Sequence, residues 1–60
     1  MARIIKNVEI AKAVADELNM NFAEVLEDID IERDPEQEEI PVEESIIEQY
    51  IDGFRASIEE

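Results

Sequence analysis

Almost all the side chains of this sequence that could do chemistry are carboxylates. The chain has 18 acidic residues against five basic ones, a formal net charge of -13, and neither His nor Cys. Paired carboxylates act as general acid and base only when one is buried with a raised pKa, and an exposed acidic face does not provide that. The hydroxyl groups of Ser45, Ser57 and Tyr50 have no base to activate them. A chain this short also leaves little room for a pocket of about 300 Å³, so we expect no catalysis and no cofactor.

Most of the acids lie between Glu24 and Glu48. This segment contains a single base, Arg33, whereas residues 1–12 have three bases against one acid. Contact with nucleic-acid phosphates requires cations, so we expect no direct nucleic-acid binding and favour a basic protein partner. We name these acids the acidic face: Glu24, Glu27, Asp28, Asp30, Glu32, Asp34, Glu36, Glu38, Glu39, Glu43, Glu44 and Glu48.

The acidic face has three interpretations. It can be a solvated surface that only keeps the chain dissolved, or it can steer the chain to a basic protein surface, where charge complementarity raises association rates. A special case of the second is mimicry of nucleic acid, because duplex DNA has one negative charge per about 1.7 Å of its axis. A helix with acids at most exposed positions, present in two copies, can approach that density.

Six acids from Asp28 to Glu39 have the spacing of a calcium loop. They stand at positions 1, 3, 5, 7, 9 and 12 of a twelve-residue window, which resembles the loop of EF-hand proteins. Arg33 occupies the sixth position, where the sharp turn needs Gly, and Pro35 occupies the eighth, where an apolar residue is usual. We therefore expect an acidic linker with weak affinity for divalent cations and no metal site.

Apolar spacing predicts helices in the first half of the chain. Ile4, Val8, Ala11, Ala15, Leu18, Phe22, Val25 and Ile29 follow one another at intervals of four and three. Asn19 can take the left-handed conformation that ends a helix, and Asn21 followed by Glu24 has the spacing of a capping box. We predict helices over 4–18 and 22–32. The alternative is one helix of about 27 residues, whose stripe would be a coiled-coil seam.

Two prolines mark a connector over 33–41, after which a third helix is predicted over 42–58. Pro35 and Pro41 disfavour a helical conformation in the residue before each of them, and most of the other connector residues are charged. Ile47, Ile51, Phe54 and Ile58 then recur at helical spacing. Gly53 inside this helix costs about 1 kcal/mol relative to Ala, so it indicates either a close approach of another backbone or simple tolerance.

The predicted fold is all-α, a single domain over 1–60 built as a helical hairpin or as three short helices. About 60 residues form a marginal core, and without Cys or His neither disulfides nor the usual zinc ligands can support it. We therefore expect a helical-bundle homodimer. The residues expected in its core and self-association surface are Leu18, Phe22, Val25, Ile29, Ile47, Ile51 and Phe54.

Two segments resemble known families. Residues 18–29, from Leu18 through the Asn21 corner, look like the helix-turn-helix corner of ribbon-helix-helix antitoxins and histone-like proteins. A ribbon-helix-helix protein needs a DNA-reading strand ahead of its first helix, for which only Met1 to Ile4 remain. The segment from Glu44 to Phe54, Glu-Ser-Ile-Ile-Glu-Gln-Tyr-Ile-Asp-Gly-Phe, is similar to a helix of small acidic anti-CRISPR proteins. That resemblance implies a phage-encoded inhibitor that fills the DNA-binding groove of a nuclease.

Together these observations predict a non-catalytic acidic protein that blocks a basic, nucleic-acid-binding surface of a host protein. The alternatives are a helical oligomerisation or adaptor module, whose apolar stripes carry the function, and an antitoxin that masks a toxin. No apolar run approaches the ~18 residues of a membrane span and no charged-then-apolar leader is present. We therefore expect a cytoplasmic protein with no membrane partner.

Overall fold

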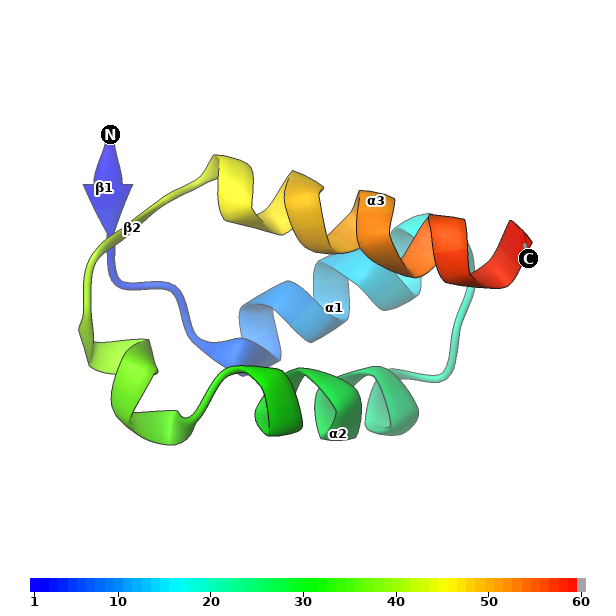
Figure 1. Ribbon diagram of the computed structural model, residues 1–60, viewed down its shortest axis with the longest axis horizontal. Coiled ribbons are helices and arrows are strands. Elements are labelled where there is room, and N and C mark those ends of the chain that lie inside the picture. The colour runs from blue at the N-terminus through cyan, green and yellow to red at the C-terminus, as the bar shows by residue number, and fades with distance from the viewer. Residues whose placement is uncertain (60) are drawn as a thin grey trace.

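The computed structural model describes residues 1–59 as three α-helices with a two-stranded sheet (Figure 1). The prediction of a mainly helical fold is confirmed, although a small sheet is present as well. None of the helices in this range combines the length and the apolar character needed to cross a membrane. The elements in chain order are β1 (Ala2–Arg3), α1 (Asn7–Leu18), α2 (Phe22–Glu32), the 3-10 helix η1 (Pro35–Glu39), β2 (Val42–Glu43) and α3 (Ser45–Glu59).

Two asparagines make the corner between α1 and α2. Asn19 has φ 56° and ψ 46°, the left-handed conformation that Asn tolerates better than most residues. Asn21 begins α2 by accepting a hydrogen bond at its side-chain oxygen from the backbone N–H of Glu24, at 3.2 Å. The predicted break is therefore confirmed, and the single helix of about 27 residues is wrong.

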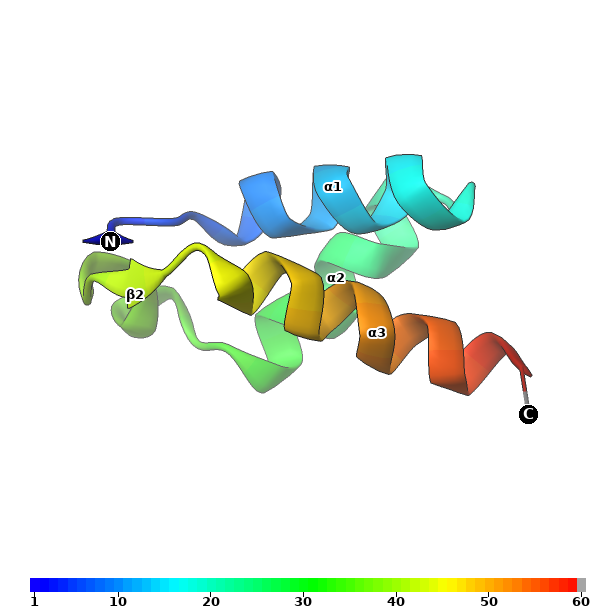
Figure 2. The same cartoon turned by 90° about the horizontal axis from the view of Figure 1, so that it is seen from above.

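The core forms around α1, which packs against both α2 and α3. In Figure 1, α1 runs between α3 and α2 and lies behind them, and Figure 2 shows the same arrangement from above. The buried side chains of α1 recur at the helical period, and they meet Ile5, Val25 and Ile29. Those buried in α1 are Asn7, Ile10, Ala11, Val14 and Ala15.

This packing corrects the predicted apolar stripe. Ile4, Val8 and Phe22, which the stripe assigned to the buried side, are 42%, 53% and 40% exposed. For Val8 the cause is that α1 covers two neighbours and needs a buried face wider than one heptad seam, whereas Ile4 precedes α1 and Phe22 begins α2. The broad face runs through Ile10 and Val14, which the stripe omitted.

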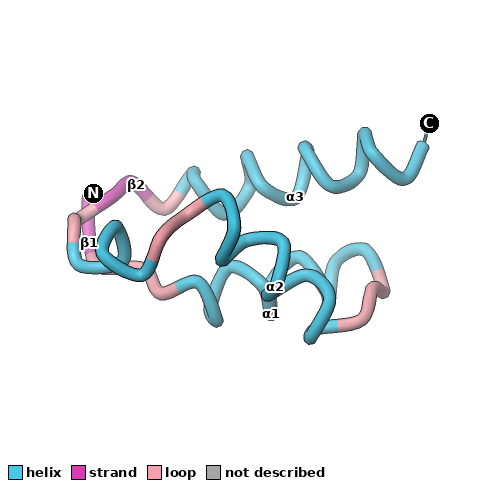
Figure 3. The backbone as a smooth tube through the Cα atoms, turned by 60° about the horizontal axis from the view of Figure 1, so that its bottom comes forward, coloured by secondary structure: helices cyan, strands magenta, loops and turns pink. Residues whose placement is uncertain are grey.

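Two short strands precede α1 and α3, and the second of them lies where the first turn of a helix was predicted. β1 pairs with β2 in antiparallel fashion, with Ala2 opposite Glu43 and Arg3 opposite Val42. Figure 3 shows the pair in magenta where the N-terminal segment meets the chain that enters α3. The predicted helix starts at residues 4 and 42 are therefore wrong by three residues each, since α1 begins at Asn7 and α3 at Ser45.

The connector has more structure than expected, although its prolines act as predicted. Asp34 and Ile40, which precede Pro35 and Pro41, have ψ 151° and ψ 123° and are extended. Between them, residues 35–39 form η1. In α3, a Cβ placed on Gly53 would meet nothing within 4 Å. No backbone of this chain approaches Gly53 closely, so the space beside it is open, and an approach by another chain stays a prediction.

Replacing the helix cap tests the corner. We expect Asn21→Ala to lower the free energy of unfolding by about 1 kcal/mol, because the N–H of Glu24 loses its acceptor. Asn21→Ser keeps an acceptor oxygen at the same net charge and should cost much less. Urea unfolding followed by circular dichroism measures both variants, and equal losses would contradict the assigned cap.

Candidate functional site

The only base of the acidic segment lies inside the protein. The Arg33 side chain ends up only 4% exposed, and its Nη1 donates hydrogen bonds to the carbonyl oxygen of Ile5 at 2.7 Å and to Oδ1 of Asn7 at 2.8 Å. Among residues 1–59, no carboxylate forms an ion pair with it, and its Nη2 has no hydrogen-bond partner. Neutral oxygens thus compensate the buried guanidinium, and such hydrogen bonds to a charged group are stronger than neutral ones.

Asn7 connects this guanidinium to two carboxylates. The Asn7 side chain is 1% exposed, and its Nδ2 donates to Oδ1 of Asp30 at 2.9 Å and to the carbonyl oxygen of Arg33 at 2.8 Å. The backbone N–H of Asn7, in the first turn of α1, donates to Oε1 of Glu38 at 2.9 Å. A carboxylate at a helix N-terminus is favourable because it meets free N–H groups and the positive end of the helix dipole. We call Asn7, Asp30, Arg33 and Glu38 the polar cluster.

The polar cluster was missed by the sequence analysis, which assigned Arg33 to an exposed connector. The apolar periodicity says nothing about a buried Asn or Arg, so the pattern offers no specific signal for either residue. A weak signal does exist, because Arg33 is the one base within a run of acids and directly follows the last residue of α2. Its burial ties the segment before α1 to the end of α2.

The burial of Arg33 leaves the outer surface of this segment to carboxylates. The twelve residues of the acidic face are exposed except Glu38, which is half-buried. Four of them are engaged within the chain: Asp30 and Glu38 with Asn7, Glu43 with the amino group of Met1, and Glu44 with Arg3. The remaining members are Glu24, Glu27, Asp28 and Glu32 on α2, Asp34, Glu36 and Glu39 at η1, and Glu48 on α3.

The other bases lie outside α2 and η1 in the chain, and Arg3 is paired. Arg3 donates to Glu9 through Nη1 and Nη2 and to Glu44 through Nε at 2.8 Å. These bonds raise the pKa of Arg3, and the bond from Arg3 lowers the pKa of Glu9. Because the pKa of Glu9 is lowered in the folded state, its contribution is present above the ordinary value of 4.5 and is lost as the pH falls through the lowered value. Lys6 and Lys12 are exposed at α1.

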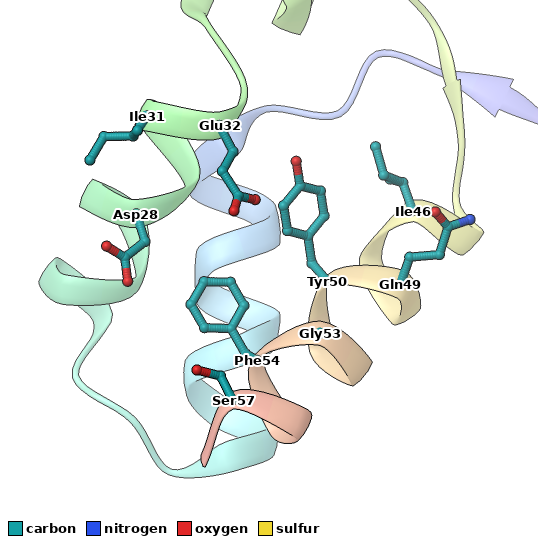
Figure 4. A pocket seen from close by; sticks show the side chains of 9 residues that line it. All are labelled: Asp28, Ile31, Glu32, Ile46, Gln49, Tyr50, Gly53, Phe54 and Ser57. Atoms are coloured by element: carbon teal, nitrogen blue, oxygen red, sulfur yellow. The ribbon is translucent and has the colours of Figure 1, made fainter. Parts of the chain in front are cut away.

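A groove of about 600 Å³ lies between α2 and α3. The expectation that so short a chain has no room for a pocket is therefore wrong. The reason is that α2 and α3 pack against α1 and barely touch each other. Figure 4 shows the rings of Tyr50 and Phe54 rising from α3 into this space, with Glu32 opposite on α2. The groove is lined by Asp28, Ile31, Glu32, Ile46, Gln49, Tyr50, Gly53, Phe54 and Ser57.

The residues predicted for self-association have three different environments. Val25 and Ile29 are fully buried in the core of the single chain, and Phe22 is exposed on α2. The other four, Leu18, Ile47, Ile51 and Phe54, are half-buried and pack against that core. The structure thus brings most of these residues together within one chain, and Phe54 also lines the groove. The homodimer itself stays a prediction.

The calcium-loop window does not form one loop. Its first three acids lie on α2, Asp34 follows that helix, and Glu36 and Glu39 belong to η1. Within residues 1–59 there is no group of three carboxylates that could hold a metal ion.

The strand before the first helix also differs from that of a ribbon-helix-helix protein. In such a protein the strand reads DNA, whereas here β1 pairs with β2 of the same chain.

Comparison with known proteins does not assign this chain to a family or a function. No protein-family model matches the chain, and no similar protein was found among curated proteins or solved structures. The geometry and charge of the site therefore carry the functional argument. What this site offers is a carboxylate surface on α2 and η1 beside an open groove, which are features suited to contact with another molecule.

Replacing Arg33 tests the polar cluster. We expect Arg33→Met to lower the free energy of unfolding by about 3 kcal/mol, because the carbonyl oxygen of Ile5 and Oδ1 of Asn7 lose a buried donor. Arg55→Met is the matched control, since it removes the same charge from an exposed position and should change stability by less than about 0.5 kcal/mol. Chemical denaturation followed by circular dichroism compares them, and similar losses would refute the structural role of Arg33.

Proposed function

We propose that this chain is a non-catalytic binding protein whose acidic face covers a basic, nucleic-acid-binding surface of another protein. The observation that carries the proposal is the burial of Arg33. With that side chain inside, a partner approaching α2 and η1 meets carboxylates and no exposed base from this segment. Such complementarity accelerates association with a basic surface and selects against acidic ones.

The spacing of acids on α2 supports mimicry of a nucleic-acid strand. From Glu24 to Glu32 the helix carries five acids, and a rise of 1.5 Å per residue makes this stretch roughly 12 Å long. The linear density is therefore about one negative charge per 3 Å, close to the value of one per 3.4 Å along a single strand of DNA. This match is to one strand, and the duplex density of one charge per about 1.7 Å is twice as high.

A protein with this activity would be an inhibitor of its partner. The resemblance of residues 44–54 to anti-CRISPR proteins agrees with a phage-encoded inhibitor that acts in the host cytoplasm. In this proposal the charge carries recognition, so affinity falls steeply as salt is added, because counterions screen the exposed carboxylates.

An adaptor or homodimerisation module is the second candidate, and the groove favours it. Its apolar lining from α3, Ile46, Tyr50 and Phe54, is only half-buried and could be covered by another chain. The two candidates differ in their response to salt, since binding through apolar side chains is not weakened by it. Sedimentation at micromolar concentration tests the homodimer. An antitoxin would instead have a toxin encoded beside it.

Neutralising three connector acids tests the proposed function. Asp34, Glu36 and Glu39 are exposed, so Asp34→Asn, Glu36→Gln and Glu39→Gln together should leave the fold intact. The assay is displacement of fluorescent duplex DNA from a panel of purified DNA-binding domains. The comparison uses each domain from which the original chain displaces DNA. We expect the triple variant to bind such a domain about tenfold more weakly, with an affinity that depends less on salt.

The control triple is Asp16→Asn, Glu17→Gln and Glu59→Gln, which removes the same number of charges from α1 and α3. It should bind within about twofold of the original chain, because none of these three carboxylates belongs to the acidic face. Equal losses from the two triples would show that net charge alone matters and would contradict a role for the acidic face. Glu38 is left unchanged because it belongs to the polar cluster.

A further inference from the structure

We propose that the groove between α2 and α3 binds a basic amphipathic helix of the partner protein. This inference rests on the proposed function, because it names the part of a basic partner that the chain would hold. The groove has a volume of about 600 Å³, and its α3 wall runs from Ile46 to Ser57, a length of roughly 17 Å or three helical turns. That length accommodates about three turns of an amphipathic helix bound in the groove.

The arrangement of the helices leaves this position open. Both α2 and α3 pack against α1 on their inner sides, and the groove lies between their outer parts (Figure 4). Ile46, Tyr50 and Phe54 are spaced four residues apart and therefore form a row along one face of α3. On the α2 side Ile31 lines the groove and is 74% exposed. A helix placed between these two walls would cover both.

Gly53 gives the groove a gap in its floor. It lies between Tyr50 and Phe54 on α3, and a Cβ at this position would meet nothing within 4 Å. No contact inside the chain therefore requires Gly here, although Gly costs the helix about 1 kcal/mol relative to Ala. An incoming apolar side chain can enter this gap and contact the two rings on either side.

The charge of the groove lining determines which kind of helix can bind there. Asp28 and Glu32 line the α2 wall, four residues apart, and no base among residues 1–59 lines the groove. The exposed base of α3, Arg55, lies near Asp52 and faces the separate hollow beside Glu17. An occupant with Lys or Arg on the two sides of its apolar stripe would pair with the wall carboxylates. A second copy of this chain would bring another net charge of -13 to the same place, so a basic partner is favoured over self-association.

The test uses a synthetic peptide of Leu and Lys, about 18 residues long, with Leu at positions i, i+3, i+4 and i+7 of each repeat. Tyr50 is the only Tyr and the chain has no Trp, so its fluorescence reports occupancy of the groove. We expect the peptide to change this fluorescence and to become helical by circular dichroism. A scrambled peptide of the same composition keeps the charge without the apolar stripe, and we expect it to bind at least about tenfold more weakly.

Two variants with matched controls locate the binding. Gly53→Gln places a long polar side chain on the floor, and Ile31→Ser removes an exposed apolar contact. Gly53→Gln should weaken peptide binding about tenfold because it fills the gap that a peptide side chain would enter. Ile31→Ser should do the same because it removes a few methylene groups from the contact. Ala56→Gln, on α3 outside the groove lining, and Ile40→Ser, in the connector, should change it less than about twofold. Gly53→Gln also improves helix propensity, so weaker binding by this variant would not reflect unfolding.

The outcomes separate this inference from the proposed function. One outcome would be that both peptides bind equally and that the groove variants have no effect. If the triple Asp34, Glu36 and Glu39 variant then binds both peptides more weakly, the binding site is the acidic face and not the groove. If an all-acidic peptide with the same Leu pattern binds as well as the basic one, the charge of the occupant is wrong. If sedimentation shows a dimer that Gly53→Gln dissociates, the occupant is a second copy and the inference is overturned.

Discussion

The fold depends on how the chain accommodates one buried positive charge. Within the described residues 1–59, the side chain of Arg33 donates hydrogen bonds only to neutral oxygens, those of Ile5 and Asn7, and both come from the segment that leads into α1. Asn7 in turn engages Asp30 of α2 and Glu38 of η1. One polar cluster therefore joins three elements that the apolar core alone would leave loosely connected at this end. In a chain of 60 residues with a small core, such hydrogen bonds are a large part of the net stability.

The same cluster links stability to recognition. A surface Arg at position 33 would interrupt the carboxylates of α2 and η1, whereas a buried one does not. The repulsion among those carboxylates opposes folding, and the polar cluster engages two of them, Asp30 and Glu38, in hydrogen bonds. The position of α1 behind both other helices produces the second feature, the groove, because α2 and α3 are held side by side without closing on each other. The acidic face and the groove thus share α2.

Local features of the chain were predictable from the sequence, and nonlocal ones were not. The corner at Asn19 and Asn21 and the extended residues before Pro35 and Pro41 follow from backbone preferences of single residues, so they were found. The pairing of Arg3 with Val42 and the contact of Arg33 with Asn7 join residues far apart in the chain, and no periodicity encodes them. The apolar stripe failed for Val8 because it assumed one packing partner for α1 rather than two, and it failed for Ile4 because that residue precedes the helix. The acidic residues of the candidate site were identified from the sequence, but the groove between α2 and α3 was not.

Proton exchange at the arginine side chains is the most direct test of the central claim, which is that the acidic segment presents carboxylates because its base is internal. The chain has three arginines, and only Arg33 is buried. By nuclear magnetic resonance, the guanidinium protons of Arg33 should exchange with water much more slowly than those of Arg55, whose side chain is 47% exposed. Exchange at Arg33 as fast as at Arg55 would place this base on the surface and would contradict the account.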